Sequence, residues 1–113
     1  MAAPKRFVQL SASRQALVRL FQSVNYGEIQ GVVIQNGDPV FHPKPTVLVD
    51  VKLDADEGSR PEEGLQDFEL RHEVCRLLAH LDELKSGKIE RIEVRAGIPR
   101  RFTIERHLTG EAR

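Results

Sequence analysis

The chain has 113 residues, of which 40% are hydrophobic and 30% are charged, and its formal net charge is zero. This size and composition are typical of one globular domain with a single hydrophobic core. No apolar run approaches the roughly 18 residues that a membrane-spanning helix needs, and the N-terminal residues lack the apolar region of a secretory signal. The single cysteine, Cys75, excludes an internal disulfide framework. We therefore expect one domain, residues 1–113, in the cytoplasm.

The charges are unevenly distributed along the chain. Residues 1–47 carry five basic side chains against two acidic ones, and residues 88–113 carry seven against four, so each of these segments has a net charge of +3. Residues 48–73 carry nine acidic side chains against three basic ones, a net charge of −6. This distribution indicates either internal charge complementarity or a basic face that binds an acidic partner.

A short N-terminal tail, residues 1–10, precedes the first predicted helix. Ser11 or Ser13 can cap this helix, and Gly27 is placed to end it. The apolar residues of the helix recur at the i, i+3, i+4, i+7 spacing of one face: Leu17, Leu20, Phe21 and Val24. The tail also carries three apolar residues that can pack on the core: Phe7, Val8 and Leu10.

A β-hairpin is predicted after this helix. Its first strand covers residues 28–35, where Val and Ile recur. Asn36-Gly37 is the commonest two-residue hairpin turn, because both residues accept positive φ. The return strand, residues 38–42, is ended by two prolines, which cannot donate hydrogen bonds to a neighbouring strand.

The clearest strand pattern covers residues 46–53. Leu48, Asp50 and Lys52 point to one side of this strand. Four apolar residues point to the other side: Val47, Val49, Val51 and Leu53. This alternation predicts a half-buried antiparallel strand with one solvated face. The acidic residues 54–64 that follow predict an exposed loop.

A second helix is predicted to begin near residues 65–67 and to run to about Lys85, where Ser86-Gly87 terminates it. Its inner face consists of six apolar residues: Phe68, Val74, Leu77, Leu78, Leu81 and Leu84. A second hairpin then pairs residues 88–95 with residues 100–106 across a turn at residues 96–97.

Residues 17–39 and 77–99 are similar enough to be two copies of one unit, offset by 60 positions with no gap. The matched positions are helix-face, strand and turn residues: Leu17 and Leu77, Val18 and Leu78, Phe21 and Leu81, Val24 and Leu84, Gly27 and Gly87, Ile29 and Ile89, Val32 and Ile92, Ile34 and Val94, Gly37 and Gly97, Pro39 and Pro99. One helix with one hairpin is marginally stable alone, but two such units can merge their hairpins into one sheet.

The repeat therefore predicts an α+β fold, a two-layer sandwich built from two α-β-β repeats. The repeats cover about residues 11–53 and 65–107 and are joined by the acidic loop. They form a four- to five-stranded, mainly antiparallel sheet with both helices on one face and an internal pseudo-two-fold axis.

The stretch from residue 16 to residue 37 resembles a family of short bacterial helix-plus-hairpin domains. The features that carry the resemblance are Tyr26-Gly27 after the helix, the strand around Ile29, and the Asn36-Gly37 turn. The resemblance covers about 25 residues directly, and the second copy only through the internal repeat. It implies the same architecture, and no activity of that family can be carried over to this chain.

Candidate sites for chemistry are sparse. His72, Cys75 and His80 share a helix at spacings that permit metal binding, but structural zinc takes four ligands in short paired spacings. Cys75 adjoins an apolar stripe, where a free cysteine behaves as a small hydrophobe rather than a nucleophile. Acidic pairs such as Asp54 and Asp56 are typical of a solvated loop, and no phosphate-binding glycine motif is present. We therefore expect no enzyme activity, no metal and no cofactor.

The second hairpin carries a signal for nucleic-acid binding. Five arginines lie where a two-stranded ribbon can follow a phosphate backbone: Arg91, Arg95, Arg100, Arg101 and Arg106. Glu90, Glu93 and Glu105 are interleaved with them, and no exposed aromatic residue is available to stack on bases. Cross-strand Arg–Glu pairs on a solvated face account for the same residues.

A protein partner is the other candidate. Val40, Phe41 and Leu48 are apolar residues that we do not expect to fit in the core together. The strand before the acidic loop is expected to be a sheet edge that is open to strand addition or self-pairing. The sequence thus predicts a small non-enzymatic interaction or regulatory module, bacterial in type, that binds an unknown protein partner or forms a homodimer and does not bind membranes. The alternative is a nucleic-acid-binding accessory protein that uses the basic hairpin, residues 88–106.

Overall fold

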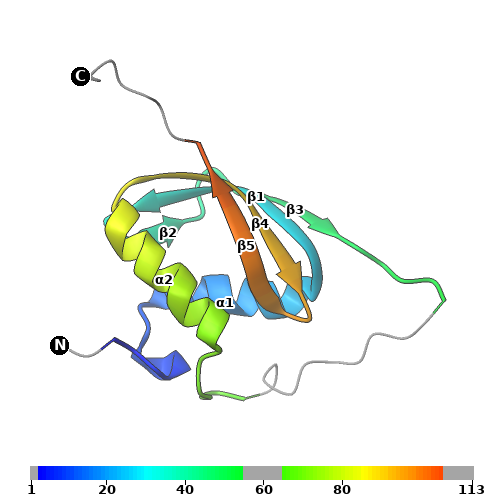
Figure 1. Ribbon diagram of the computed structural model, residues 1–113, viewed down its shortest axis with the longest axis horizontal. Helices are drawn as coiled ribbons and strands as arrows, with labels where there is room; N and C mark the ends of the chain where they lie inside the picture. Colours follow the sequence, from blue (N-terminus) through cyan, green and yellow to red (C-terminus); the bar gives the residue numbers. More distant parts are fainter. Residues whose placement is uncertain (1–2, 55–64, 106–113) are drawn as a thin grey trace.

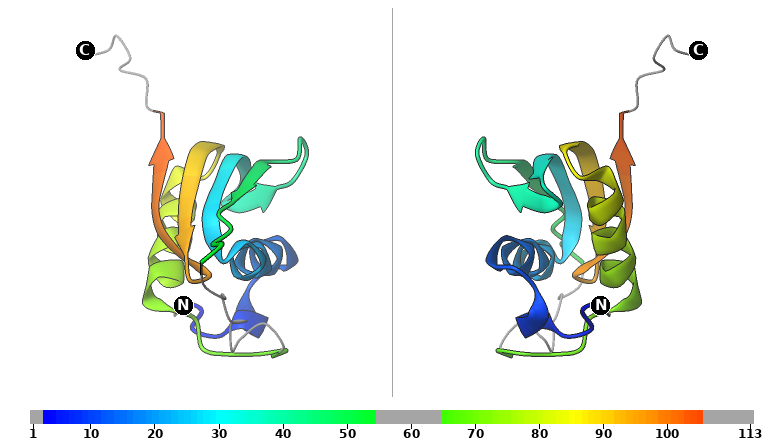
Figure 2. Two further views of the ribbon diagram at one scale, coloured as in Figure 1. Left: turned by 90° about the vertical axis from the view of Figure 1, so that its right-hand side faces the viewer. Right: turned by 90° about the vertical axis from the view of Figure 1, so that its left-hand side faces the viewer.

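The computed structural model describes residues 3–54 and 65–105, so most of the acidic loop and Arg106 lie outside the described residues. The described residues form two α-helices and a five-stranded antiparallel sheet of strand order β2-β1-β4-β5, in which β3 also pairs with β1 (Figures 1 and 2). The elements in chain order are a short 3-10 helix (Phe7–Gln9), α1 (Ala12–Val24), β1 (Tyr26–Gln35), β2 (Asp38–Val40), β3 (Thr46–Val49), α2 (His72–Leu84), β4 (Gly87–Arg95) and β5 (Ile98–Ile104). The predicted α+β class is confirmed.

The two copies identified in the sequence fold alike. Each helix ends at a residue of positive φ, Asn25 at 64° and Lys85 at 63°. The prediction that Gly27 ends α1 is therefore wrong, because Gly27 lies within β1. The copies exchange two backbone hydrogen bonds: Gly37 N donates to Lys85 O at 2.7 Å, and Gly97 N donates to Asn25 O at 2.8 Å. These bonds are equivalent at the 60-residue offset, so they are related by the predicted pseudo-two-fold axis.

The central strands β1 and β4 share one core with both helices. Ile29 pairs with Ile92 and Val32 pairs with Ile89, so the two pairs are equivalent to each other at the 60-residue offset. All four side chains are fully buried and belong to the same apolar cluster as the inner faces of α1 and α2. The helices therefore cover one face of the sheet, and the other face is left to polar residues.

The start of α2 differs from the sequence prediction. The helix begins at His72, with Phe68 in the segment that leads to it. Phe7 N donates to Phe68 O at 2.9 Å, and the two rings stack with 4.8 Å between their centroids. Phe68 is buried, as an inner-face residue of a helix would be, so apolar periodicity could not distinguish the two conformations.

The N-terminal segment is part of the fold. Phe7 and Leu10 are buried, as predicted, whereas the side chain of Val8 is exposed. The Arg6 side chain donates from Nε to Asp67 Oδ2 at 2.8 Å, which ties this segment to the one that precedes α2. The bond from Arg6, together with a bond from the Val8 N–H, lowers the pKa of Asp67.

β3 is shorter and more exposed than predicted. It ends at Val49 instead of Leu53, and all of its residues are exposed, so the predicted half-buried face is wrong. The chain leaves the sheet after β3 and extends away from the body of the molecule (Figure 1). β2 and β3 both pair with the outer side of β1, and β5 pairs with the outer side of β4 in the same way. β3 is therefore the continuation of a return strand that residues 41–45 interrupt.

Candidate functional site

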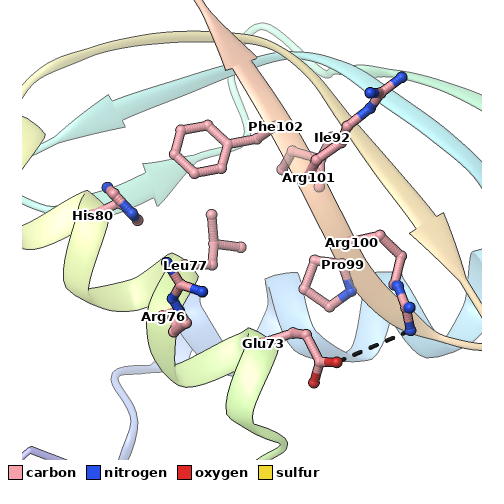
Figure 3. Close-up of a pocket in the computed structure, with 9 residues that line it drawn as sticks. All are labelled: Glu73, Arg76, Leu77, His80, Ile92, Pro99, Arg100, Arg101 and Phe102. Atoms are coloured by element: carbon pink, nitrogen blue, oxygen red, sulfur yellow. Dashed lines mark ion pairs between the residues drawn. The ribbon is translucent and has the colours of Figure 1, made fainter.

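The four arginines of the second hairpin that the structure describes are divided between the two faces of the sheet. Arg91 and Arg95 lie on the face that the helices do not cover, because the alternate residues Ile92 and Val94 point into the core. Arg101 lies opposite Glu93 and reaches the same polar face. Arg100 is the extra residue at a β-bulge, and its side chain extends toward α2 (Figure 3). The hairpin thus does not present one continuous row of arginines.

Each of these arginines lies near a carboxylate. Arg91 Nε is 3.8 Å from Glu28 Oε2, and Glu93 forms ion pairs with both Arg95, at 3.5 Å, and Arg101, at 3.3 Å. Such exposed ion pairs stabilise a fold by only about 0–1 kcal/mol, but they balance the charge of the surface. The polar face of the sheet therefore has the cross-strand Arg–Glu pairs of a solvated face, which weakens the case for a phosphate-binding ribbon.

An exposed apolar segment lies at the opposite edge of the sheet. We call residues 47–53 the apolar edge, and its apolar members are Val47 (38% exposed), Leu48 (47%), Val49 (53%), Val51 (72%) and Leu53 (95%). The other two residues predicted for a partner surface behave differently: Val40 is half-buried, and Phe41 packs against the core. Alternation in the sequence placed most of these residues inside, because it cannot show whether a second layer covers them.

The backbone of β3 is also open on one side. Asp50 N donates to Tyr26 O at 2.7 Å, so the even-numbered residues of β3 direct their hydrogen-bonding groups toward β1. Val47 and Val49 direct theirs away from β1, and none of the described strands pairs with that side. Apolar side chains beside unpaired backbone groups are typical of an edge that accepts another strand.

A groove of about 260 Å³ separates α2 from β5 (Figure 3). Its floor is apolar and consists of Leu77, Ile92, Pro99 and Phe102. Its rim carries charged and polar side chains from both elements: Glu73, Arg76 and His80 of α2, and Arg100 of β5. Residues three and four apart on a helix share a face, so the sequence contained part of this signal, but it did not show that β5 would lie beside them.

The cysteine and histidines of α2 do not gather into a reactive centre. Cys75 is half-buried and packs against the core. His80 Nδ1 is 3.8 Å from Glu83 Oε1, and the His80 ring packs edge-on against Phe102. In the part of the chain that the structure describes, no group of three or more potential metal ligands occurs.

No family model, curated protein or solved structure matches the chain. The resemblance to short bacterial helix-plus-hairpin domains thus stays a prediction. Neither described helix is long and apolar enough to cross a membrane.

Proposed function

We propose that this chain is a small, non-enzymatic cytoplasmic interaction module of bacterial type that forms a homodimer through the apolar edge. The observation that carries the proposal is the exposure of five apolar side chains, from 38% to 95%, along the open edge strand β3 and the residues that follow it to Leu53. Contiguous exposed apolar surface usually marks an interaction site, and natural sheets protect such edges when nothing binds to them.

A second copy of the chain is complementary to this edge. In an antiparallel pair centred on Val51, with the strands extended through residues 50–53, Asp50 of each copy lies opposite Lys52 of the other. Val49 then lies opposite Leu53. Opposite charges and apolar pairs directly across two strands each stabilise the pairing by about 0.2–1 kcal/mol. The contact uses the same surface on both copies, so it closes at a dimer.

The environment of the most reactive side chains supports a non-enzymatic role. Nucleophilic catalysis needs a nucleophile and a base within hydrogen-bond reach of each other. Cys75 packs against the core, and His80 is engaged by Glu83 and Phe102. A binding function does not need such a pair of reactive groups, because it requires only a complementary surface.

Light scattering after size-exclusion chromatography, over a series of protein concentrations, tests the homodimer. Val49→Lys places a charge opposite the apolar side chain of Leu53 of the other copy, and Val8→Lys is a matched control, because Val49 and Val8 are 53% and 54% exposed. We expect a dimeric mass for the wild type and for Val8→Lys, and a monomeric mass for Val49→Lys. A monomeric wild type at every concentration, or a Val49→Lys variant that still dimerises, would overturn the proposal.

A further inference from the structure

We infer that the groove between α2 and β5 binds an extended acidic segment of a partner protein, which lies along β5 and inserts an aliphatic or aromatic side chain between the strand and the helix. This site is separate from the apolar edge, since β5 and β3 lie at opposite edges of the sheet. The groove has four features that fit such a segment: its floor, the charges on its rim, the open edge of β5, and the contrast with the first copy.

The floor of the groove suits an apolar side chain. Leu77 and Ile92 belong to the buried core, and Pro99 and Phe102 of β5 complete the apolar floor. A volume of about 260 Å³ is enough for one large side chain, but it is small for a drug-sized ligand, whose sites usually have about 300–1,000 Å³. The shape therefore favours one anchor residue from a longer chain.

The rim of the groove favours carboxylates. Arg76 is exposed and makes no ion pair with any residue that the structure describes. Arg100 Nη1 is 3.9 Å from Glu73 Oε2, a long contact that an incoming carboxylate can replace or share. Guanidinium groups bind carboxylates in bidentate geometry, so two arginines facing one groove are suited to an acidic peptide.

The edge of β5 can hold the peptide backbone. β5 pairs with β4 on one side and is the last strand in the sheet order of the described residues. An extended segment that pairs with such an edge gains main-chain hydrogen bonds, and its alternate side chains point toward the neighbouring helix. Backbone pairing along β5, one apolar anchor and flanking carboxylates describe a single ligand class.

The first copy lacks these features at equivalent positions. Ala16 and Leu20 of α1 correspond to Arg76 and His80 of α2 at the 60-residue offset. Leu20 packs against the core, together with Phe41, so apolar residues fill that side of the first copy. The fold therefore does not require a charged open groove beside the helix. This indicates that the groove of the second copy has a role other than stabilising the fold.

Fluorescence anisotropy with a labelled peptide tests the inference. The probe is a short synthetic peptide in which Asp and Glu alternate with Leu and Phe, and the reference probe carries Lys in place of the acidic residues. We expect the full chain to bind the acidic probe and not the reference probe, with an affinity that falls as salt is added. Equal binding of both probes, or no binding of the acidic probe at low salt, would overturn the inference.

Substitutions locate the binding site. Arg76→Ala, and the double variant Arg76→Ala with His80→Leu, give the groove the residues that α1 has, so we expect the affinity to fall by about tenfold or more. Arg95→Ala is the matched control, because Arg95 is an exposed arginine of β4 on the face of the sheet opposite to the groove. A loss of affinity in Arg95→Ala equal to that in Arg76→Ala would contradict the assignment.

Three further measurements control for unfolding, for general anion binding and for dimerisation. Thermal unfolding of Arg76→Ala checks that the exposed substitution leaves the fold intact. Competition by a short single-stranded RNA that displaces the acidic peptide would show a general anion site and overturn the peptide assignment. Val49→Lys should bind the peptide as the wild type does, so a failure of dimerisation and a failure of the groove can be distinguished.

Discussion

The two copies share a backbone and differ in the surface that each presents. The second copy has an open groove with Arg76 and His80 on its rim, whereas the first has Ala16 and Leu20 at the equivalent positions. The sheet edges differ as well: β5 is continuous, while its counterpart is interrupted and ends in the exposed β3. Core positions are retained in both copies because each copy supplies half of one core. Surface positions are free to diverge, and the two candidate binding surfaces lie where the symmetry ends.

One interior position also departs from the symmetry. Arg14 of α1 and Val74 of α2 are equivalent at the 60-residue offset. Arg14 Nη2 donates to Gly37 O at 2.7 Å and to Asp82 Oδ1 at 2.6 Å, so it joins the first hairpin turn to α2. Val74 is a buried apolar residue that lines the same small cavity as Gly97. The same place in the fold is thus held by hydrogen bonds in one copy and by apolar packing in the other.

The largest expected effect comes from one pair of equivalent core leucines. Leu17 is 0% exposed and Leu77 is 4% exposed, and Leu77 also lines the groove. We expect Leu17→Ala to lower the free energy of unfolding by about 3–5 kcal/mol and Leu77→Ala by about 2–3 kcal/mol, since solvent or a side chain can fill the second cavity. Urea denaturation measures both values. Equal losses would show that the groove does not open the second core to solvent.

Two equivalent glycines sharpen the comparison of the sheet edges. A Cβ atom on Gly27 would lie 2.0 Å from Leu48 O, whereas a Cβ atom on Gly87 would meet only the side chain of Leu84, at 3.2 Å. Gly27→Ala must therefore displace β3, and we expect it to lower the free energy of unfolding by about 3 kcal/mol. Gly87→Ala should change it by less than about 1 kcal/mol, because the flexible Leu84 side chain can move and alanine restricts the unfolded chain. A large loss in Gly87→Ala would contradict this difference.

The Arg14 contact is expected to have an intermediate effect. Arg14→Leu keeps an apolar stem but removes the hydrogen bonds to Gly37 and Asp82, so we expect a loss of about 1.5–3 kcal/mol in the free energy of unfolding. Arg95→Ala is the control, since the ion pair of Arg95 with Glu93 is exposed and is expected to contribute about 0–1 kcal/mol. Similar stability of the two variants would show that leucine replaces Arg14 as valine does in the second copy.

The smallest effect concerns the segments that lead into the two helices. The Arg6 hydrogen bond holds the pKa of Asp67 below its ordinary value of 3.8, so the unfolded chain binds this proton more readily than the folded chain. The resulting stability is present above pH 3.8 and is lost as the pH falls through the lower pKa of the folded state. Asp67→Asn should remove this part of the pH dependence, measured by denaturation from neutral to acid pH. If the free energies of unfolding of the wild type and the variant differ by the same amount at every pH, the assignment of this pH dependence to Asp67 is wrong.

Much of the fold follows from local chemistry. Asn36 and Gly37 adopt φ values of 52° and 80°, as a tight hairpin turn of this kind requires, and the second turn repeats them. Ser11 caps α1 by accepting a hydrogen bond from Arg14 N, as expected of a serine before an apolar helix stripe. These features depend on a few neighbouring residues, so the sequence was sufficient to predict them. The start of α2 was not predictable in this way, because Phe68 is buried by a distant segment of the chain.

The candidate sites depended on tertiary contacts to a greater extent. The sequence pointed to the arginines of the second hairpin, but only the fold brings Arg100 beside Arg76 and turns Arg91 toward Glu28 on the other face. Similarly, Val94 and Val49 occupy equally alternating strands, yet Val94 is 1% exposed and Val49 is 53% exposed. Residue order establishes the repeat, the helices, the turns and which side chains share a face of a strand. Burial requires a second layer across that face, and the layer comes from parts of the chain that only folding brings into contact.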